Sequence, residues 1–232
     1  MNPIGALAVE PAELAHTRSI DHRSTAVRDF VAATGADREP DPVRRAVQLY
    51  YAVRDDIRYE IYGADLSEDG LTASTVATVR KGMCIHKSVL YAAALRAVGI
   101  PSRLMITDVR NHLVSPQLKR MVGDVFHYHT LTVLRPADRW IRATPVFNRR
   151  LCRLYDMEPL EFDGRTDSMH HPFDGIGRKH MEFVRFHGDF DDLPYRTIID
   201  GMRRQHPAMF AGATSFRGGS SLVSDAISPR SL

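Results

Sequence analysis

The stretch that decides the fold runs from Lys81 to Arg103 and reads KGMCIHKSVLYAAALRAVGIPSR. From position 84 to 98, small and apolar side chains occupy most of the circumference of a helix, a pattern typical of a helix buried on nearly all sides. Gly99 marks the end of this helix, and Pro101 prevents its continuation. We therefore predict a core helix over residues 84–98 whose first residue is Cys84.

The segments before this helix are mostly helical in pattern, and those after it are extended. Helices are expected over 24–33, 42–56 and 72–80, with a short strand over 57–62. Asp41 offers a helix cap, and Pro42 stands at the first helical position, where its missing N–H costs nothing. Strands are expected over 103–108, 128–134 and 140–144. A helix followed by antiparallel strands indicates an α+β domain with a central helix packed on a sheet.

The rest of the chain has a different character. Turn residues are spread from about residue 160 onward, with helices expected near 178–187 and 194–205. The first 24 residues are weakly patterned and suggest an early strand and a connection. We expect a core over 1–159, an irregular and helical extension over 160–211 that caps the core, and a flexible tail over 212–232.

Composition excludes several classes of protein. The 232 residues carry 31 Lys and Arg against 28 Asp and Glu. The basic residues are scattered rather than gathered around aromatic platforms, so nucleic acid is not an expected partner. No apolar run approaches the roughly 20 residues that span a bilayer. The N-terminal stretch lacks the features of a signal peptide, and two cysteines are too few for a disulfide framework, so we expect a cytoplasmic protein.

Cys84 is the first candidate for chemistry. Free N–H groups and the macrodipole place a partial positive charge at the start of its helix, which favours thiolate over thiol. Gly82 allows close approach of a substrate carbonyl, and the same N–H groups can donate to an oxyanion. The alternative is a buried cysteine that only packs, which is the common role of free cysteines. Cys152 has no helix start or glycine beside it, so packing is its expected role.

The base for such a nucleophile must come from elsewhere in the chain. His127 and His129 are two residues apart, so on a regular strand they share one face, with Tyr128 on the other. Either one is a candidate base. The strand over 140–144 is expected to pass beside them and to offer Thr144, and then Asn148, to orient the imidazole.

Several of these residues resemble the core of the transglutaminase-like superfamily. The similar segments are Lys81 to Cys84, Tyr91 to Arg96, and Gly99 to Arg103. Tyr128-His129, Trp140 and Ala143-Thr144-Pro145 resemble the family's later histidine strand and its aspartate strand. Positions 42–150 carry the resemblance, and parts of 161–194 look similar to a bacterial branch of the superfamily.

The resemblance implies a papain-like, transglutaminase-like cysteine-peptidase core with Cys84 as nucleophile and His129, rather than His127, as base. It also places Thr144 where the family has the aspartate of its triad. A hydroxyl cannot stabilise imidazolium as a carboxylate does, so Asn148 or an acid from the region 160–175 is the candidate substitute orienter. Tyr59, His127 and Asp163 are candidate substrate-binding residues.

No cofactor is expected, since nucleotide-binding glycine motifs are absent. The acidic, histidine-containing segment over 161–174 lacks regular ligand spacing, so no metal site is expected there.

The leading hypothesis is a cysteine-dependent amide or peptide hydrolase or acyltransferase that acts through a thioester. The alternatives are a catalytically inactive binding or scaffold module and a redox-sensing thiol protein. A peptide or other amide is the expected substrate, and the sequence does not indicate an oligomeric state.

Overall fold

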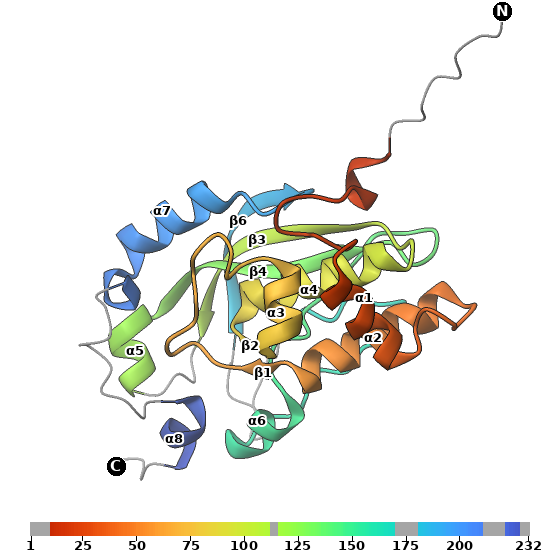
Figure 1. The fold of residues 1–232 in the computed structure, drawn as a ribbon. Helices are drawn as coiled ribbons and strands as arrows, with labels where there is room; N and C mark the ends of the chain where they lie inside the picture. Colours follow the sequence, from red (N-terminus) through yellow and green to blue (C-terminus); the bar gives the residue numbers. More distant parts are fainter. Residues whose placement is uncertain (1–9, 112–115, 170–180, 211–220, 228–232) are drawn as a thin grey trace, which may run out of the picture.

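The computed structural model describes residues 10–111, 116–169, 181–210 and 221–227, which form a mixed helix and sheet structure. Its main sheet has four strands in the order β5-β4-β3-β6, with every neighbouring pair antiparallel. The central helix α4 packs against β4 and β3 (Figure 1). The bounds are α4 (Cys84–Ala97), β3 (Ser102–Asn111), β4 (Val125–Leu134), β5 (Ile141–Ala143) and β6 (Met181–Phe190). The predicted central helix and the three predicted strands after it are confirmed.

Three helices surround α4 on the sides that the sheet leaves open: α1 (Thr25–Thr34), α2 (Pro42–Asp56) and α3 (Ala73–Val79). Each begins at a side-chain cap, because Ser24, Asp41 and Thr72 accept hydrogen bonds from backbone N–H groups of the first turn. Nearly all of α4 is buried as a result. This enclosure explains why small and apolar side chains occupy most of the circumference of α4.

The predicted strand over 57–62 is reduced to two residues, β1 (Arg58–Tyr59), which pairs in parallel with β2 (Lys81–Gly82). Tyr59 lies opposite Gly82 in this pairing. The two short strands therefore bring Tyr59 next to the chain that enters α4.

The pairing of β3 with β4 contains a bulge. Thr107 pairs with His129, whereas Val109 pairs with Phe126, so β4 advances by three residues where β3 advances by two. Tyr128 lies within the bulge with a φ of 61°, which is rare for a bulky residue. The extra residue interrupts the alternation of side chains across the sheet.

The helix predicted over 178–187 is wrong for the described residues 181–187, which belong to strand β6; residues 178–180 lie outside the described part. The apolar side chains of Val184 and Phe186 remain exposed on this strand at the edge of the sheet. On that side of β3, the backbone N–H and C=O groups form hydrogen bonds with β6, and the pairing shifts register twice.

The remaining helices are α5 (Pro116–Val122), α6 (Arg149–Leu154), α7 (Tyr195–Gln205) and α8 (Leu222–Ile227), with 3-10 turns at Ala12–Leu14 and Pro207–Phe210. Helix α7 confirms the prediction over 194–205. Residues 10–24 contain no strand, so the early strand is not found in the described part of that segment. None of the helices described is long and apolar enough to cross a membrane.

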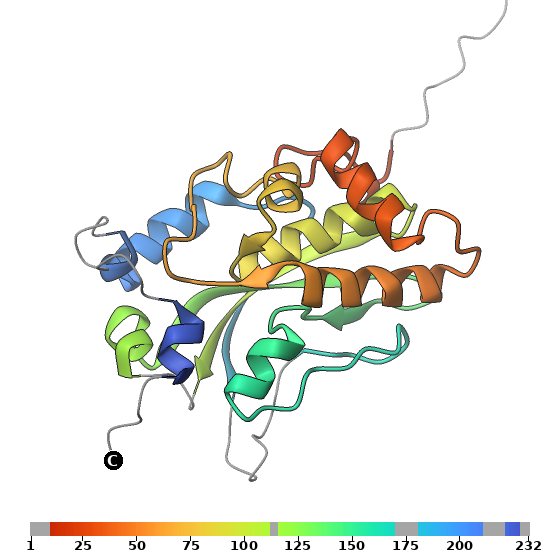
Figure 2. The ribbon, with the colours of Figure 1, turned by 60° about the horizontal axis from the view of Figure 1, so that its bottom comes forward.

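Within the segment 212–232, for which the sequence predicts a tail, residues 222–227 form the helix α8 and pack against α6 (Figure 2). The carboxylate of Glu60 accepts a hydrogen bond from the N–H of Leu222, and the hydroxyl of Tyr155 donates to the carbonyl of Leu222. The hydroxyl of Tyr62 donates to Asp225 at 2.6 Å. The Gly- and Ser-rich sequence before this helix gave no local sign of it, because the contacts that hold the helix come from residues far along the chain.

Candidate active site

Cys84 stands at the first position of α4 as predicted, and its side chain is fully buried. The backbone groups of Thr130, Ile85 and Cys84 itself lie near enough to the sulfur to lower the pKa of the thiol. Burial nevertheless dominates and raises the pKa of the thiol to about 11. The expectation of a thiolate at rest is therefore corrected. Charges at a helix start are worth roughly 0.3–1 kcal/mol, less than one pKa unit, whereas full burial shifts a pKa by up to about 3–5 units.

His129 lies on β4 directly before Thr130, whose backbone lies near the Cys84 sulfur. Its imidazole is buried, and burial lowers its pKa to about 4. Within the described part of the chain, Nε2 of His129 has no hydrogen-bond partner. The candidate base is thus in a low-dielectric environment without a group that would stabilise its protonated form.

Thr144 shares a cavity with His129, so the structure brings these two predicted residues together. The cavity has an empty volume of about 220 Å³ and is lined also by Val146, Phe147, Leu160, Met169 and Met181. Among the residues described, Oγ1 of Thr144 is a second buried polar atom without a hydrogen-bond partner. The interior leaves room for about one water molecule. Two buried polar atoms beside such a space favour a polar occupant between them.

The contacts of Asn148 do not support its role as a substitute orienter. Its Nδ2 donates to the carbonyls of Arg54 and of Ile57, the latter at 2.8 Å, and its Oδ1 accepts from the N–H of Tyr59 at 2.6 Å. Lys87 donates to the same two carbonyls at 2.8 and 2.7 Å. The amide is therefore engaged in joining the end of α2 to β1.

His127 and His129 do not share a face, contrary to the expectation for a regular strand. The bulge at Tyr128 separates them, and Nδ1 of His127 lies 3.0 Å from Oδ2 of Asp108. Its backbone N–H donates to Nε2 of His206 at 2.9 Å. His127 therefore belongs to a polar cluster around Asp108 and is not a second base beside Cys84.

The two other candidate substrate-binding residues lie in different surroundings. Tyr59 is partly buried, and its phenol lies near enough to Cys84 for the two to interact electrostatically; its pKa is raised, by burial first and by Cys84 second. Asp163 is exposed, and its carboxylate accepts hydrogen bonds from the N–H groups of Arg165 and Thr166 in its own turn. Tyr59 is thus placed beside the sulfur, whereas Asp163 stabilises a surface turn.

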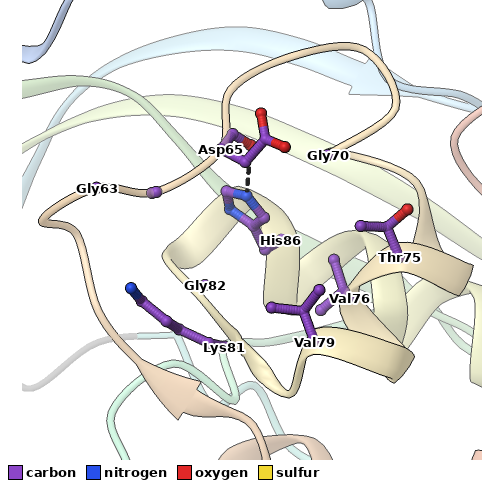
Figure 3. A pocket seen from close by; sticks show the side chains of 10 residues that line it. Gly63, Asp65, Gly70, Thr75, Val76, Val79, Lys81, Gly82 and His86 are labelled. Atoms are coloured by element: carbon purple, nitrogen blue, oxygen red, sulfur yellow. Dashed lines mark hydrogen bonds between the residues drawn. The ribbon is translucent and has the colours of Figure 1, made fainter. Parts of the chain in front are cut away.

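His86 is a residue of this region that the sequence reasoning missed. Its Nδ1 accepts from the N–H of Met83 at 3.3 Å, and its Nε2 donates to the carbonyl of Asp65 at 2.9 Å (Figure 3). Burial lowers its pKa to about 4, so the ring is neutral. A side chain at Gly82 would collide with His86. The need for glycine at this position therefore comes from His86, and the signal was a histidine two residues after the cysteine in an otherwise apolar helix.

His86 also forms a wall of a cavity with an empty volume of about 440 Å³. Figure 3 shows Lys81 at its rim and Val76 and Val79 on the side of α3. Gly63, Asp65 and Gly70, from the loop before α3, also line the cavity. His86 thus connects the turn that carries Cys84 to this loop.

Cys84 and Cys152 are both free and buried, so they do not pair with each other. Among the described residues, no group of three or more His, Cys, Asp or Glu side chains could hold a metal ion. Positions 170–174 of the acidic segment lie outside the described part.

Comparison with known proteins gave one match. The family model described as the transglutaminase-like superfamily matches residues 29–145. No curated protein and no solved structure matches the chain. The matched region contains the whole of α2, α3, α4, β3 and β4, and it ends directly after Thr144.

Proposed function

Because the chain belongs to the transglutaminase-like superfamily, which includes cysteine hydrolases and acyltransferases, we propose that it is a cysteine-dependent amide or peptide hydrolase or acyltransferase. Cys84 is the nucleophile and His129 is the base. One observation carries the proposal: the buried sulfur lies at the start of α4, and the backbone of Thr130, the residue that follows His129, is near enough to lower the pKa of the thiol. This arrangement supports proton exchange between the thiol and the imidazole.

The reaction begins with transfer of the thiol proton of Cys84 to His129 as the sulfur attacks the carbonyl carbon of an amide. The oxyanion accepts hydrogen bonds from N–H groups at the start of α4. His129 then donates its proton to the leaving amine, the C–N bond breaks, and a thioester remains. Water, or a second amine, gives a proton to His129 and attacks the thioester. The acid or new amide leaves, and the sulfur recovers its proton.

Both reacting groups are neutral at rest. The pKa of Cys84 lies near 11 and that of His129 near 4, so at pH 7 the thiol is protonated and the imidazole is unprotonated. Charge separation in this pair is therefore unfavourable until substrate binding changes the polarity of the site. We propose that Tyr59, partly buried near the sulfur, lies against the bound peptide or amide.

The test is Cys84-dependent turnover of peptide amides. A pool of peptides containing glutamine and asparagine is incubated with the protein, with and without a fluorescent primary amine, and analysed by mass spectrometry. A gain of about 1 Da at an amide, or cleavage of the chain, reports hydrolysis, whereas incorporation of the amine reports transamidation. Hydroxylamine captures the thioester as a hydroxamate.

We expect turnover by the parent protein and a loss of at least about 100-fold in Cys84→Ala and in His129→Ala. Cys152→Ala is the matched control, because it removes the other buried free thiol, and it should retain turnover. Turnover that survives in Cys84→Ala refutes the proposal.

A catalytically inactive binding module is the second candidate. The fully buried thiol, its raised pKa and the hydroxyl at position 144 favour this function. It predicts that peptides bind equally to the parent and to Cys84→Ala without conversion. The raised thiol pKa argues against a redox-sensing thiol, since such cysteines are low-pKa and accessible.

A further inference from the structure

Asp108 lies on β3 at the point where the pairing with both neighbouring strands changes register. Its side chain is buried, and its carboxylate accepts three hydrogen bonds. Oδ1 accepts from the N–H of Tyr128 at 3.0 Å and from Nε2 of His187 at 2.8 Å. Oδ2 lies 3.0 Å from Nδ1 of His127. Burial opposes its ionisation, but these hydrogen bonds outweigh burial and lower the pKa of Asp108.

The contacts of Asp108 converge on Tyr128, the residue with the left-handed backbone. The ring of Tyr128 stacks on His187 with centroids 4.8 Å apart, and a side chain at Gly201 on α7 would collide with its hydroxyl. A bulky residue adopts a positive φ only where its surroundings hold it there. Asp108 supplies the hydrogen bond to the backbone, and His187 and Gly201 supply the space and the packing for the ring.

The conformation of Tyr128 determines where His129 points. Because the bulge inserts one residue, His129 pairs with Thr107 and reaches the cavity of Thr144, while His127 reaches Asp108. Without the bulge, the alternation along β4 would place the two histidines on the same face. Thr130, whose backbone lies near the Cys84 sulfur, is two residues beyond Tyr128.

We propose that Asp108 is a positioning residue for the candidate base: by holding Tyr128 in its left-handed conformation, its carboxylate keeps the imidazole of His129 in the cavity that it shares with Thr144. The inference rests on the proposed function for its meaning in catalysis. The position of His129 is measurable without any substrate, so failure of this inference is distinguishable from failure of the proposed function.

The experiment is a titration of the His129 ring by NMR in the full chain, with the resonance assigned by comparison with His129→Ala. The parent should titrate near pH 4, as its burial dictates. In Asp108→Asn, a displaced ring gains solvent, and its pKa should rise by about one unit or more toward 6.5. Where the turnover test succeeds, the same variant should lose at least about tenfold in turnover while remaining folded.

Ser102→Ala is the control for general loosening. Ser102 is another buried polar residue of β3, and its hydroxyl donates to the carbonyl of Ala92 at 3.0 Å, far along the strand from the bulge. This variant should lose stability but keep the parental pKa of His129. An unchanged His129 titration in folded Asp108→Asn overturns the inference, and so does an equal shift in Ser102→Ala.

A second pair of variants tests the route through Tyr128. Glycine adopts a positive φ without cost, so Asp108→Asn combined with Tyr128→Gly should recover at least half of the shift in the His129 pKa. Absence of recovery contradicts the role of the left-handed backbone. If Asp108→Asn does not fold, His187→Gln replaces it, since this change removes one hydrogen bond to Asp108 and the stacking on Tyr128. A rise of the His129 pKa in His187→Gln supports the inference, and an unchanged pKa overturns it.

Discussion

His129 and Thr144 line one cavity, and burial there lowers the proton affinity of the candidate base. Nε2 of His129 and Oγ1 of Thr144 line one small cavity, and in the described part of the chain neither atom has a hydrogen-bond partner. A carboxylate at position 144 would stabilise imidazolium, whereas a hydroxyl accepts a hydrogen bond without adding charge. The neutral resting state of the site therefore follows from two causes, the burial of both reacting groups and the residue type at position 144.

Replacing Thr144 by aspartate should raise the pKa of His129 from about 4 by roughly 1–3 units, because a nearby opposite charge favours the protonated ring. The higher proton affinity should also increase the rate at which iodoacetamide alkylates Cys84 at pH 7. NMR titration of His129 and mass spectrometry of the Cys84 peptide measure the two effects. Thr144→Val is the control and should show neither. An unchanged His129 pKa in Thr144→Asp would mean that the new carboxyl stays protonated, and it would contradict this prediction.

Among the secondary-structure elements, the strand pair β1–β2 is too short to form a long ladder of backbone hydrogen bonds. It is stabilised instead by hydrogen bonds from a side-chain amide. Asn148, directly before α6, bonds to carbonyls at the end of α2 and to the N–H of Tyr59 on β1. Tyr59 is in turn paired with Gly82, two residues before Cys84. Through β1, Asn148 thus stabilises β2, the segment that leads into Cys84.

Asn148→Ala should destabilise the fold by roughly 2–4 kcal/mol, because it leaves a buried N–H and two carbonyls with fewer hydrogen bonds. Urea denaturation measures this loss. Asn148→Asp keeps the acceptor for the N–H of Tyr59 but loses the donors. It should therefore also lower the free energy of unfolding, by an amount different from that of Asn148→Ala. Neither variant should move the His129 titration. A shift of that titration in Asn148→Ala would restore the orienting role that the contacts do not support.

In the molecule as a whole, the C-terminal helix α8 connects α6 to the residues directly after β1, namely Glu60 and Tyr62. The buried carboxylate of Glu60 accepts from the N–H groups of Ile61, Tyr62 and Leu222. Two segments that are far apart in the sequence therefore meet at one carboxylate.

Removal of residues 221–232 should lower the free energy of unfolding by roughly 1–3 kcal/mol, since Glu60 loses one N–H and Leu222 loses its buried site. Thermal and urea denaturation measure the change. Glu60→Gln in both the full and the shortened chain forms a double-mutant cycle. The cost of Glu60→Gln should be smaller in the shortened chain, and strict additivity would show that Glu60 and α8 are not coupled.

Acid should destabilise the whole molecule before its carboxylates titrate. Burial lowers the pKa of His86, His129 and His206 to about 4, below the ordinary value of 6.5 that they regain on unfolding. The stability that these neutral rings contribute is present above pH 6.5 and is lost as the pH falls toward 4. Near pH 5, unfolding should take up about 2–3 protons through them. Urea denaturation between pH 7 and 4.5 should show this decline, and a flat profile would contradict it.

The sequence by itself determined the elements whose causes are local. Asp41 and Pro42 begin α2, Ser24 begins α1, and the apolar circumference of α4 requires burial, so these helices and the α+β class follow from short-range patterns. The motif around Cys84 identified the family for the same reason, because its residues are close together in the chain. Pairing Cys84 with His129 rested on that resemblance rather than on periodicity.

Only the tertiary structure decided the ionisation of Cys84, the separate faces of His127 and His129, the role of Asn148, and the strand β6. Each depends on groups far along the chain: burial by the surrounding helices and sheet, the carboxylate of Asp108, the end of α2, and the open edge of β3. Desolvation and strand pairing arise from such distant contacts, and their energies exceed the local preferences that the sequence displays.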